Sequence, residues 1–158
     1  MTISDGEILE FIELGCIEID PFSETNMTSN GYDLCVGGIE MDDQMVEPSI
    51  YNKYRIPLMK SFRVITMERV TITNWFTASL NLKTRFTRRG IQATFGRIDA
   101  AFAGTLTFGM FNGNENSFEL EFGQPIVQIG FERMNAPALS DYVKRSGHYQ
   151  HQKTVVMK

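Results

Sequence analysis

The chain has 158 residues, of which 42% are hydrophobic and 22% are charged, and its formal net charge at pH 7 is −4. This length predicts one domain, residues 1–158, with a sizeable buried core. The negative charge argues against nucleic acid as a partner, because binding a phosphate backbone requires a basic surface. The cysteines, Cys16 and Cys35, are expected to be buried free thiols rather than a disulfide framework.

No signal peptide and no long apolar segment opens the sequence. We therefore expect a cytoplasmic protein with no membrane partner. The two histidines, His148 and His151, do not form a cluster with zinc-site spacing. Asp42 and Asp43 could bind a hard cation, although a solvated loop is several times more common for such a pair.

The first predicted element is a short helix. Ser4 and Glu7 have the spacing of a capping box, apolar residues follow at helical intervals within residues 8–12, and Gly15 supplies a stop. Residues 16–20 then have the pattern of a strand.

Strands and loops alternate in the next part of the chain. The polar residues 23–30 predict a loop that leads into a strand at Tyr32-Asp33-Leu34. Residues 40–54, with several acids and a proline, predict a mobile loop.

From Phe62 onward the sequence has a strong β pattern. Apolar residues and threonines form short runs that we expect to break at Glu68-Arg69 and at Asn74, and the pattern continues over residues 105–111. Residues 118–122 alternate phenylalanine or leucine with glutamate, which is typical of a half-buried strand, and another strand is predicted over 126–131. The whole predicts an all-β domain, a distorted jelly roll or barrel, with a short N-terminal helix.

The segment from residue 135 to residue 158 is polar and contains Tyr142, His148 and Tyr149. Such a tail is either disordered or closes over a ligand, and its composition leaves both alternatives open.

A cluster of cations and a lone acid suggest a reaction. Lys83, Arg85, Arg88 and Arg89 are four cations within seven residues, and Asp99 follows in an apolar run, GRIDAAFAG. Cations can hold and neutralise a polyphosphate while the acid takes a proton from attacking water. On chemistry alone, a solvated strand end and a turn-capping aspartate explain these residues equally well.

Five segments, in order, are similar to sequence motifs of one superfamily. They are NGYDL at 30–34, KTRFTRRGI at 83–91, FGRIDAAFAG at 95–104, Gly123 with IVQI at 126–129, and GHYQHQK at 147–153. In this order they resemble the motifs of the trimeric dUTPases and dCTP deaminases. The opening SDGEI and IDPF segments resemble the deaminase branch.

The resemblance implies a dUTPase-like jelly-roll subunit in a homotrimer, with active sites at subunit interfaces and Mg²⁺ carried by the triphosphate of the substrate. The deaminase branch keeps a proton-shuttling glutamate in its G-x-I-T-L-E-x-x-N motif, and the matching position here is Gly109. Asp99 occupies the position of the water-activating aspartate of dUTPases. The sequence is therefore interpreted as a dUTP diphosphatase, which releases dUMP and pyrophosphate.

The same resemblance assigns expected roles. Asp99 would activate water, Arg88 and Lys83 would stabilise phosphate charge, and Asp33 would hold Mg²⁺ through water. The substrate-binding residues would be Lys83, Thr84, Arg85, Gly96, Ile98, Phe102, Gly104, Gln128, Tyr149 and Gln152. Four of these keep an alternative: Arg85 could point to solvent, Phe102 could pack only in the core, and Tyr149 with Gln152 could belong to a disordered end.

Three rival interpretations remain open at this point. One is a dCTP deaminase, or a bifunctional enzyme, that uses another acid in place of Gly109. Another is a non-catalytic, nucleotide-binding regulatory trimer. The third is an unrelated jelly-roll domain of the lectin or capsid kind.

Overall fold

The computed structural model describes residues 1–145 and 147–154. The helices are α1 (Asp5–Glu13), a 3₁₀ turn (Glu24–Asn26), α2 (Thr84–Thr87) and α3 (Tyr142–Arg145). The strands are β1 (Ile17–Asp20), β2 (Met27–Thr28), β3 (Gly31–Met41), β4 (Gln44–Met45), β5 (Lys53–Ile56), β6 (Ser61–Ile72), β7 (Phe76–Leu82), β8 (Ile91–Thr94), β9 (Ala103–Asn112), β10 (Phe118–Glu121) and β11 (Pro125–Arg133).

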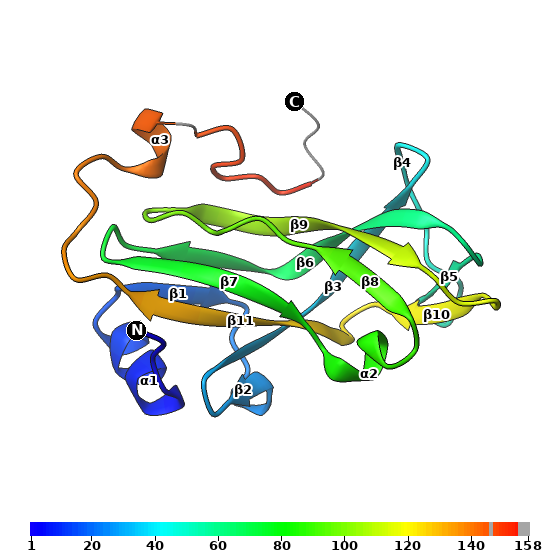
Figure 1. The fold of residues 1–158 in the computed structure, drawn as a ribbon, viewed down its shortest axis with the longest axis horizontal. Coiled ribbons are helices and arrows are strands. Elements are labelled where there is room, and N and C mark those ends of the chain that lie inside the picture. Colours follow the sequence, from blue (N-terminus) through cyan, green and yellow to red (C-terminus); the bar gives the residue numbers. More distant parts are fainter. Residues whose placement is uncertain (146, 155–158) are drawn as a thin grey trace.

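The described strands form one large curved sheet and one small one (Figure 1). The main path of the large sheet runs β7-β11-β3-β6-β9-β8, with β1 paired to β6 and with β2 and β4 paired to β3. All of these pairs are antiparallel. The small sheet pairs β10 with β5.

The large sheet is nearly closed by a contact between its two ends. Ile98, in the segment before β9, exchanges both main-chain hydrogen bonds with Ala78 of β7, at 2.9 and 3.1 Å. The enclosed core is apolar, and Tyr32, Phe76 and Phe131 are among its largest fully buried side chains. The predicted mostly β, barrel-like architecture is therefore confirmed.

The N-terminal helix forms as predicted. The Ser4 side chain accepts from the main-chain N–H of Glu7, and the Glu7 carboxylate accepts from the main-chain N–H of Ser4 at 2.9 Å. Gly15 follows the helix with φ of 68°, a conformation that glycine adopts without steric cost.

Several predicted boundaries are wrong. Residues 40–54 are not one mobile loop, because β3 continues through a buried Glu40, and β5 includes a buried Tyr54. The expected break at Glu68-Arg69 is a bulge within a continuous β6, and it places Glu68 in the interior. Phe122 lies beyond the end of β10 and is exposed.

The described part of the tail packs against the large sheet. Residues 142–145 form α3, and residues 149–152 lie along the first half of β9 (Figure 1). Residue 146 and residues 155–158 of the predicted mobile tail lie outside the described residues. Among the described helices, none is long and apolar enough to cross a membrane.

Candidate active site

Asp99 lies in the loop between β8 and β9, where its exposed side chain borders a cavity of about 520 Å³. This hairpin cavity is within the size range of small-molecule sites. It is lined by Arg63, Leu80, Phe95, Gly96, Arg97, Ile98, Asp99, Phe102, Leu106, Thr107, Phe108, Gly109, Tyr142, His148, Tyr149 and Gln152.

The loop that carries Asp99 is held by its neighbours rather than by regular strand pairing. Besides the Ile98–Ala78 bridge, the Thr77 hydroxyl donates to the Ile98 carbonyl at 2.7 Å, and Arg97 Nε donates to the same hydroxyl at 3.1 Å. These contacts fix the main chain on one side of Asp99 and leave its carboxylate facing solvent.

Asp99 also borders a second cavity of about 770 Å³, on the side of β11 and α3. The charged side chains around this second cavity include Arg97, Glu132, Arg133 and Arg145, and Arg97 pairs with Glu132 at 3.0 Å. The Asp99 carboxylate therefore stands between two open spaces, an arrangement that gives water access to it.

The tail forms one wall of the hairpin cavity. The Gln152 carbonyl accepts from the main-chain N–H of Thr105 at 3.1 Å, and its carboxamide donates to the Thr105 carbonyl at 2.7 Å and to the Thr107 hydroxyl at 3.2 Å. Tyr149 borders the same space. Within this subunit, the described part of the predicted lid is docked on β9.

Gly104 lies against the tail in this subunit. A Cβ atom added at this residue would lie 3.2 Å from the Gln152 nitrogen and 3.2 Å from the Phe102 ring. The missing side chain therefore lets the tail approach β9 in this subunit. Phe102 is buried, packs edge-on against Tyr142 with ring centroids 5.8 Å apart, and also lines the cavity. Phe102 therefore packs in the core and also borders the hairpin cavity.

A second group of predicted residues lies on neighbouring strands β3, β11 and β7. Asp33 of β3 and Gln128 of β11 are register partners, and Lys83 directly follows β7. Lys83 forms an ion pair with Asp33, and its main-chain N–H donates to the Ile126 carbonyl at 3.1 Å. The Gln128 carboxamide donates to the Thr28 hydroxyl.

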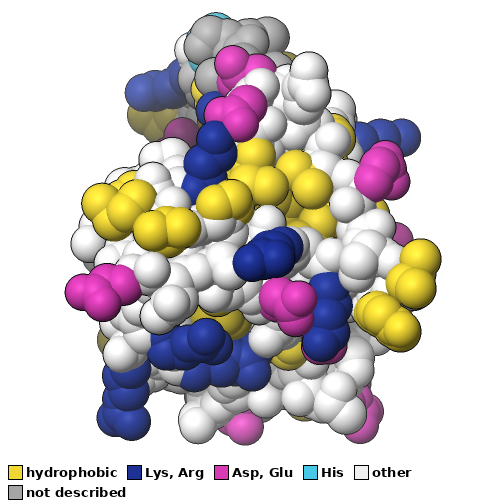
Figure 2. Space-filling view, turned by 90° about the vertical axis from the view of Figure 1, so that its right-hand side faces the viewer, with side chains coloured by type: hydrophobic (Ala, Val, Ile, Leu, Met, Phe, Trp, Pro, Cys, Tyr) yellow, Lys and Arg dark blue, Asp and Glu magenta, His cyan; other side chains and the backbone are white. Residues whose placement is uncertain are grey.

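The remaining cations, Arg85, Arg88 and Arg89, lie on α2 or directly after it. The segment that could have been a solvated strand end is therefore a short helix. Arg85 is exposed, and its guanidinium donates to the Pro125 carbonyl and lies 4.9 Å from the Phe86 ring centroid. Thr84, Arg88 and Arg89 are exposed. Figure 2 shows Lys and Arg side chains gathered on the lower left of this end of the molecule, where α2 lies.

One chain does not bring the two groups together. Gly96, Ile98, Asp99, Phe102, Tyr149 and Gln152 meet at the hairpin cavity, whereas Asp33, Lys83, Thr84, Arg85, Arg88 and Gln128 are absent from its lining. In Figure 1, α2 lies in the lower part of the view, whereas α3 and the tail lie along the top, above β9.

Two polar residues of the interior were missed by the sequence analysis. Arg63 of β6 lines the hairpin cavity, and the buried Glu40 of β3 pairs with it. The sequence did contain a signal for Arg63. It stands between two apolar strand residues, Phe62 and Val64, so its side chain points to the opposite face of the sheet from theirs.

The described residues include no group of three or more His, Cys, Asp or Glu side chains that could hold a metal ion. Asp33 supplies one carboxylate, which Lys83 already neutralises. A single oxygen ligand fits Mg²⁺ only if the ion keeps several waters and takes its other ligands from substrate phosphates.

Comparison with known proteins identifies a family model and relatives with two different names. Residues 39–134 match a family model described as dCTP deaminase-like. A dCTP deaminase of Thermococcus kodakarensis is 32% identical over 142 residues, covering 89% of this chain and 90% of that protein. A probable deoxyuridine 5′-triphosphate nucleotidohydrolase of Sulfolobus islandicus rod-shaped virus 1 is 28% identical over 158 residues, covering 99% of this chain and 98% of that protein.

Solved structures show the same fold. A dCTP deaminase from Agrobacterium tumefaciens superposes with a TM-score of 0.70 at 15% identity, covering 85% of this chain and 49% of that one, so this chain spans about half its length. The dUTPase of Staphylococcus bacteriophage 80alpha gives a TM-score of 0.55 at 14% identity, covering 79% and 95%. These two likenesses support the predicted dUTPase-like jelly roll.

Proposed function

The chain belongs to the dCTP deaminase-like family, and we propose that within this family it acts as a dUTP diphosphatase, which hydrolyses dUTP to dUMP and pyrophosphate. The observation that carries the proposal is the glycine at position 109 of β9, on the wall of the hairpin cavity. Between Ala100 and Asn112 the sequence has no titratable side chain, so this strand offers no group to move protons on a cytosine ring.

Asp99 is the group we assign to the chemistry. Its carboxylate would orient a water molecule and take its proton while the water oxygen attacks the α-phosphorus in line. The bond between the α-phosphorus and the bridging oxygen breaks, and pyrophosphate leaves. The exposure of Asp99 between two cavities is consistent with this use of water.

The phosphate-stabilising cations would come from a second copy of the chain. Arg88 and Lys83 are the proposed donors, with the Thr84 hydroxyl and the Gln128 carboxamide as further contacts. Since none of them lines the hairpin cavity of its own subunit, a homotrimer with sites between subunits would join the two groups. Mg²⁺ bound to the triphosphate would supply further charge neutralisation, and Asp33 is the carboxylate we assign to hold it through water.

A dCTP deaminase is the second candidate, favoured by similarity to archaeal proteins of that name. The two candidates differ in their products. Release of pyrophosphate from dUTP supports the first, and release of ammonia from dCTP supports the second.

The test is a turnover assay of the full chain with Mg²⁺ and dUTP, dCTP, dTTP or UTP, with pyrophosphate and ammonia both measured. We expect pyrophosphate from dUTP, and we expect Asp99→Asn to lower this rate by about 10²- to 10⁴-fold, the usual contribution of a positioned base. Glu18→Gln is the control for loss of a carboxylate, because Glu18 is exposed on β1 and borders neither cavity. Ammonia from dCTP without pyrophosphate from dUTP would refute the proposal.

A further inference from the structure

Arg63 belongs to a row of residues that crosses four strands and lines a cavity of about 570 Å³. Arg63 and Gly109 of this row also border the hairpin cavity. Glu40 of β3 pairs in register with Arg63 of β6, Arg63 with Gly109 of β9, and Gly109 with Thr94 of β8. Directly opposed residues of antiparallel strands point to the same face of the sheet. Because residue 109 has no side chain, nothing stands between Arg63 and Thr94 in this row.

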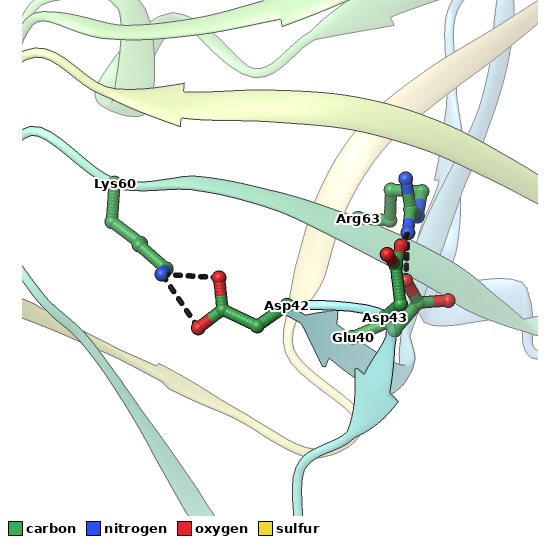
Figure 3. Close-up of polar contacts among 5 residues, drawn as sticks. All are labelled: Glu40, Asp42, Asp43, Lys60 and Arg63. Atoms are coloured by element: carbon green, nitrogen blue, oxygen red, sulfur yellow. Dashed lines mark hydrogen bonds and ion pairs between the residues drawn. The ribbon is translucent and has the colours of Figure 1, made fainter.

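Two carboxylates fix one side of the Arg63 guanidinium. Its Nη2 donates to Glu40 and to Asp43, and Figure 3 shows both carboxylates on the same side of the guanidinium. Glu40 is only 5% exposed, so it is a rigid anchor rather than a solvated surface partner. The neighbouring pair of Lys60 and Asp42 is separate from this contact.

The same guanidinium keeps an unused donor. Among the described residues, Arg63 forms its hydrogen bonds to these carboxylates through Nη2 alone, and Arg63 borders the hairpin cavity. A guanidinium has five N–H donors, so an acceptor supplied by a ligand in this cavity could pair with Nη1, which those carboxylates do not occupy.

The two ends of the cavity suggest which ligand atom reaches Arg63. Asp99, Arg63 and Gly109 all border the hairpin cavity. If the α-phosphate of a nucleotide that fills this cavity is at Asp99, its base points toward Arg63 and Gly109. The substituent at position 4 of a pyrimidine ring lies opposite the bond to the sugar, so it is the part of the base that reaches farthest.

We infer that Arg63 selects uracil over cytosine by donating a hydrogen bond to the oxygen at position 4 of the base. This inference rests on the proposed function, because it takes Asp99 as the phosphate end. Uracil presents a carbonyl oxygen there, which accepts, whereas cytosine presents an amino group, which donates. Arginine has donors and no acceptor, so it can donate to the uracil oxygen. It cannot pair with the cytosine amino group, which is also a donor.

The experiment compares the binding of dUMP and dCMP by calorimetry, which needs no turnover. Wild type is expected to bind dUMP more tightly, and Arg63→Met is expected to weaken dUMP binding by about 10- to 100-fold, the usual effect of losing a charged hydrogen bond. Binding of dCMP should be unchanged or stronger. Arg63→Lys, which keeps a cationic donor, should recover part of the preference.

Arg55→Met is the control for loss of an arginine, since Arg55 is exposed on β5 and does not border the cavity. If Arg63→Met does not fold because Glu40 is left unpaired, the variant Glu40→Gln/Arg63→Met removes that charge. An independent measurement uses wild type with 4-thio-dUMP, whose sulfur is a weaker acceptor. Its affinity should fall relative to dUMP in wild type and should not fall in the variants that lack Arg63.

Equal effects of Arg63→Met on dUMP and dCMP, or equal wild-type affinities for the two nucleotides, would overturn the inference. These outcomes are distinct from failure of the proposed function. If the protein releases pyrophosphate from dUTP but shows no Arg63-dependent preference, only the inference about Arg63 is wrong. If it prefers dUMP through Arg63 but releases no pyrophosphate, the assigned reaction is wrong.

Discussion

The hairpin cavity and the cations around α2 are assembled in opposite ways. The cavity joins segments far apart in the sequence, β6, the loop before β9 and the tail, whereas the cations follow one another in one short segment on and around α2. The hairpin cavity contains the carboxylate of Asp99, and the segment around α2 contains the cations. The arginines of the cavity, Arg63 and Arg97, are held by carboxylates, and the carboxylate on the other side, Asp33, is held by Lys83.

This difference shows that closeness in sequence is a poor guide to a catalytic unit. Arg88 and Asp99 are eleven residues apart, yet only Asp99 borders the cavity. β8 and its following loop carry the chain away from α2, as Figure 1 shows. A complete site, on the proposed mechanism, requires a second copy of the chain.

The largest expected effect comes from mixing two inactive variants. Asp99→Asn and Arg88→Gln should each lack dUTP hydrolysis as pure proteins. After the two are unfolded and refolded together in equal amounts, about a quarter of the sites in random trimers would combine an intact Asp99 with an intact Arg88 from a neighbour. Pyrophosphate release should therefore reappear in the mixture. A mixture as inactive as its components would show that both groups serve the same subunit.

A smaller effect is expected from loosening the tail. Gln152→Ala removes two side-chain hydrogen bonds to β9 and a wall of the cavity, so we expect KM for dUTP to rise about tenfold. Gln150→Ala is the matched control, because its carboxamide bonds to Ala101 and Ala103 but does not line the cavity. Steady-state kinetics would measure both. An unchanged KM in Gln152→Ala would contradict a role for the tail in substrate binding.

Glu68 is a fully buried carboxylate of β6, which predicts a pH-dependent stability. Its carboxylate accepts from the Cys35 N–H at 2.8 Å, its other oxygen is buried without a partner among the described residues, and burial raises the pKa of Glu68. The unfolded chain therefore releases this proton at a lower pH than the folded protein does. Consequently, stability is lost as pH rises above the ordinary glutamate pKa.

Glu68→Gln cannot ionise, so its stability relative to wild type should be greater at pH 7 than at pH 4. Thermal unfolding of both proteins at the two pH values measures this, and the Tm of the variant relative to wild type is expected to be higher at pH 7 than at pH 4. Glu18→Gln, an exposed residue of β1, is the control. A Tm difference that is independent of pH would contradict the raised pKa.

The smallest expected effect is the absence of a reaction at Cys35. Burial, followed by the nearby Glu68 carboxylate, raises the pKa of the Cys35 thiol to about 12, so almost no thiolate exists at pH 8. Cys16 is partly exposed. We expect iodoacetamide to label native protein at Cys16 and not at Cys35, as judged by mass spectrometry of peptides. Equal labelling of both in native protein would show that the β3–β6 region opens.

The sequence by itself determined the elements whose signals are local. The capping box at Ser4 and Glu7 specified α1, since its hydrogen bonds lie within one turn. Alternation of apolar residues specified the strands, and the ordered motifs indicated the family. The sequence also contained the glycine at position 109, on which the proposed activity depends.

Only the tertiary structure decided the partners of the charged residues. A break was expected at Glu68 because a glutamate rarely lies inside a strand core, but a bulge in β6 places it against Cys35 of β3. Likewise, Arg63 meets Glu40 and faces Gly109 only because the sheet order puts β6 between β3 and β9. Register between distant strands depends on packing across the whole sheet, and no local pattern contains that information.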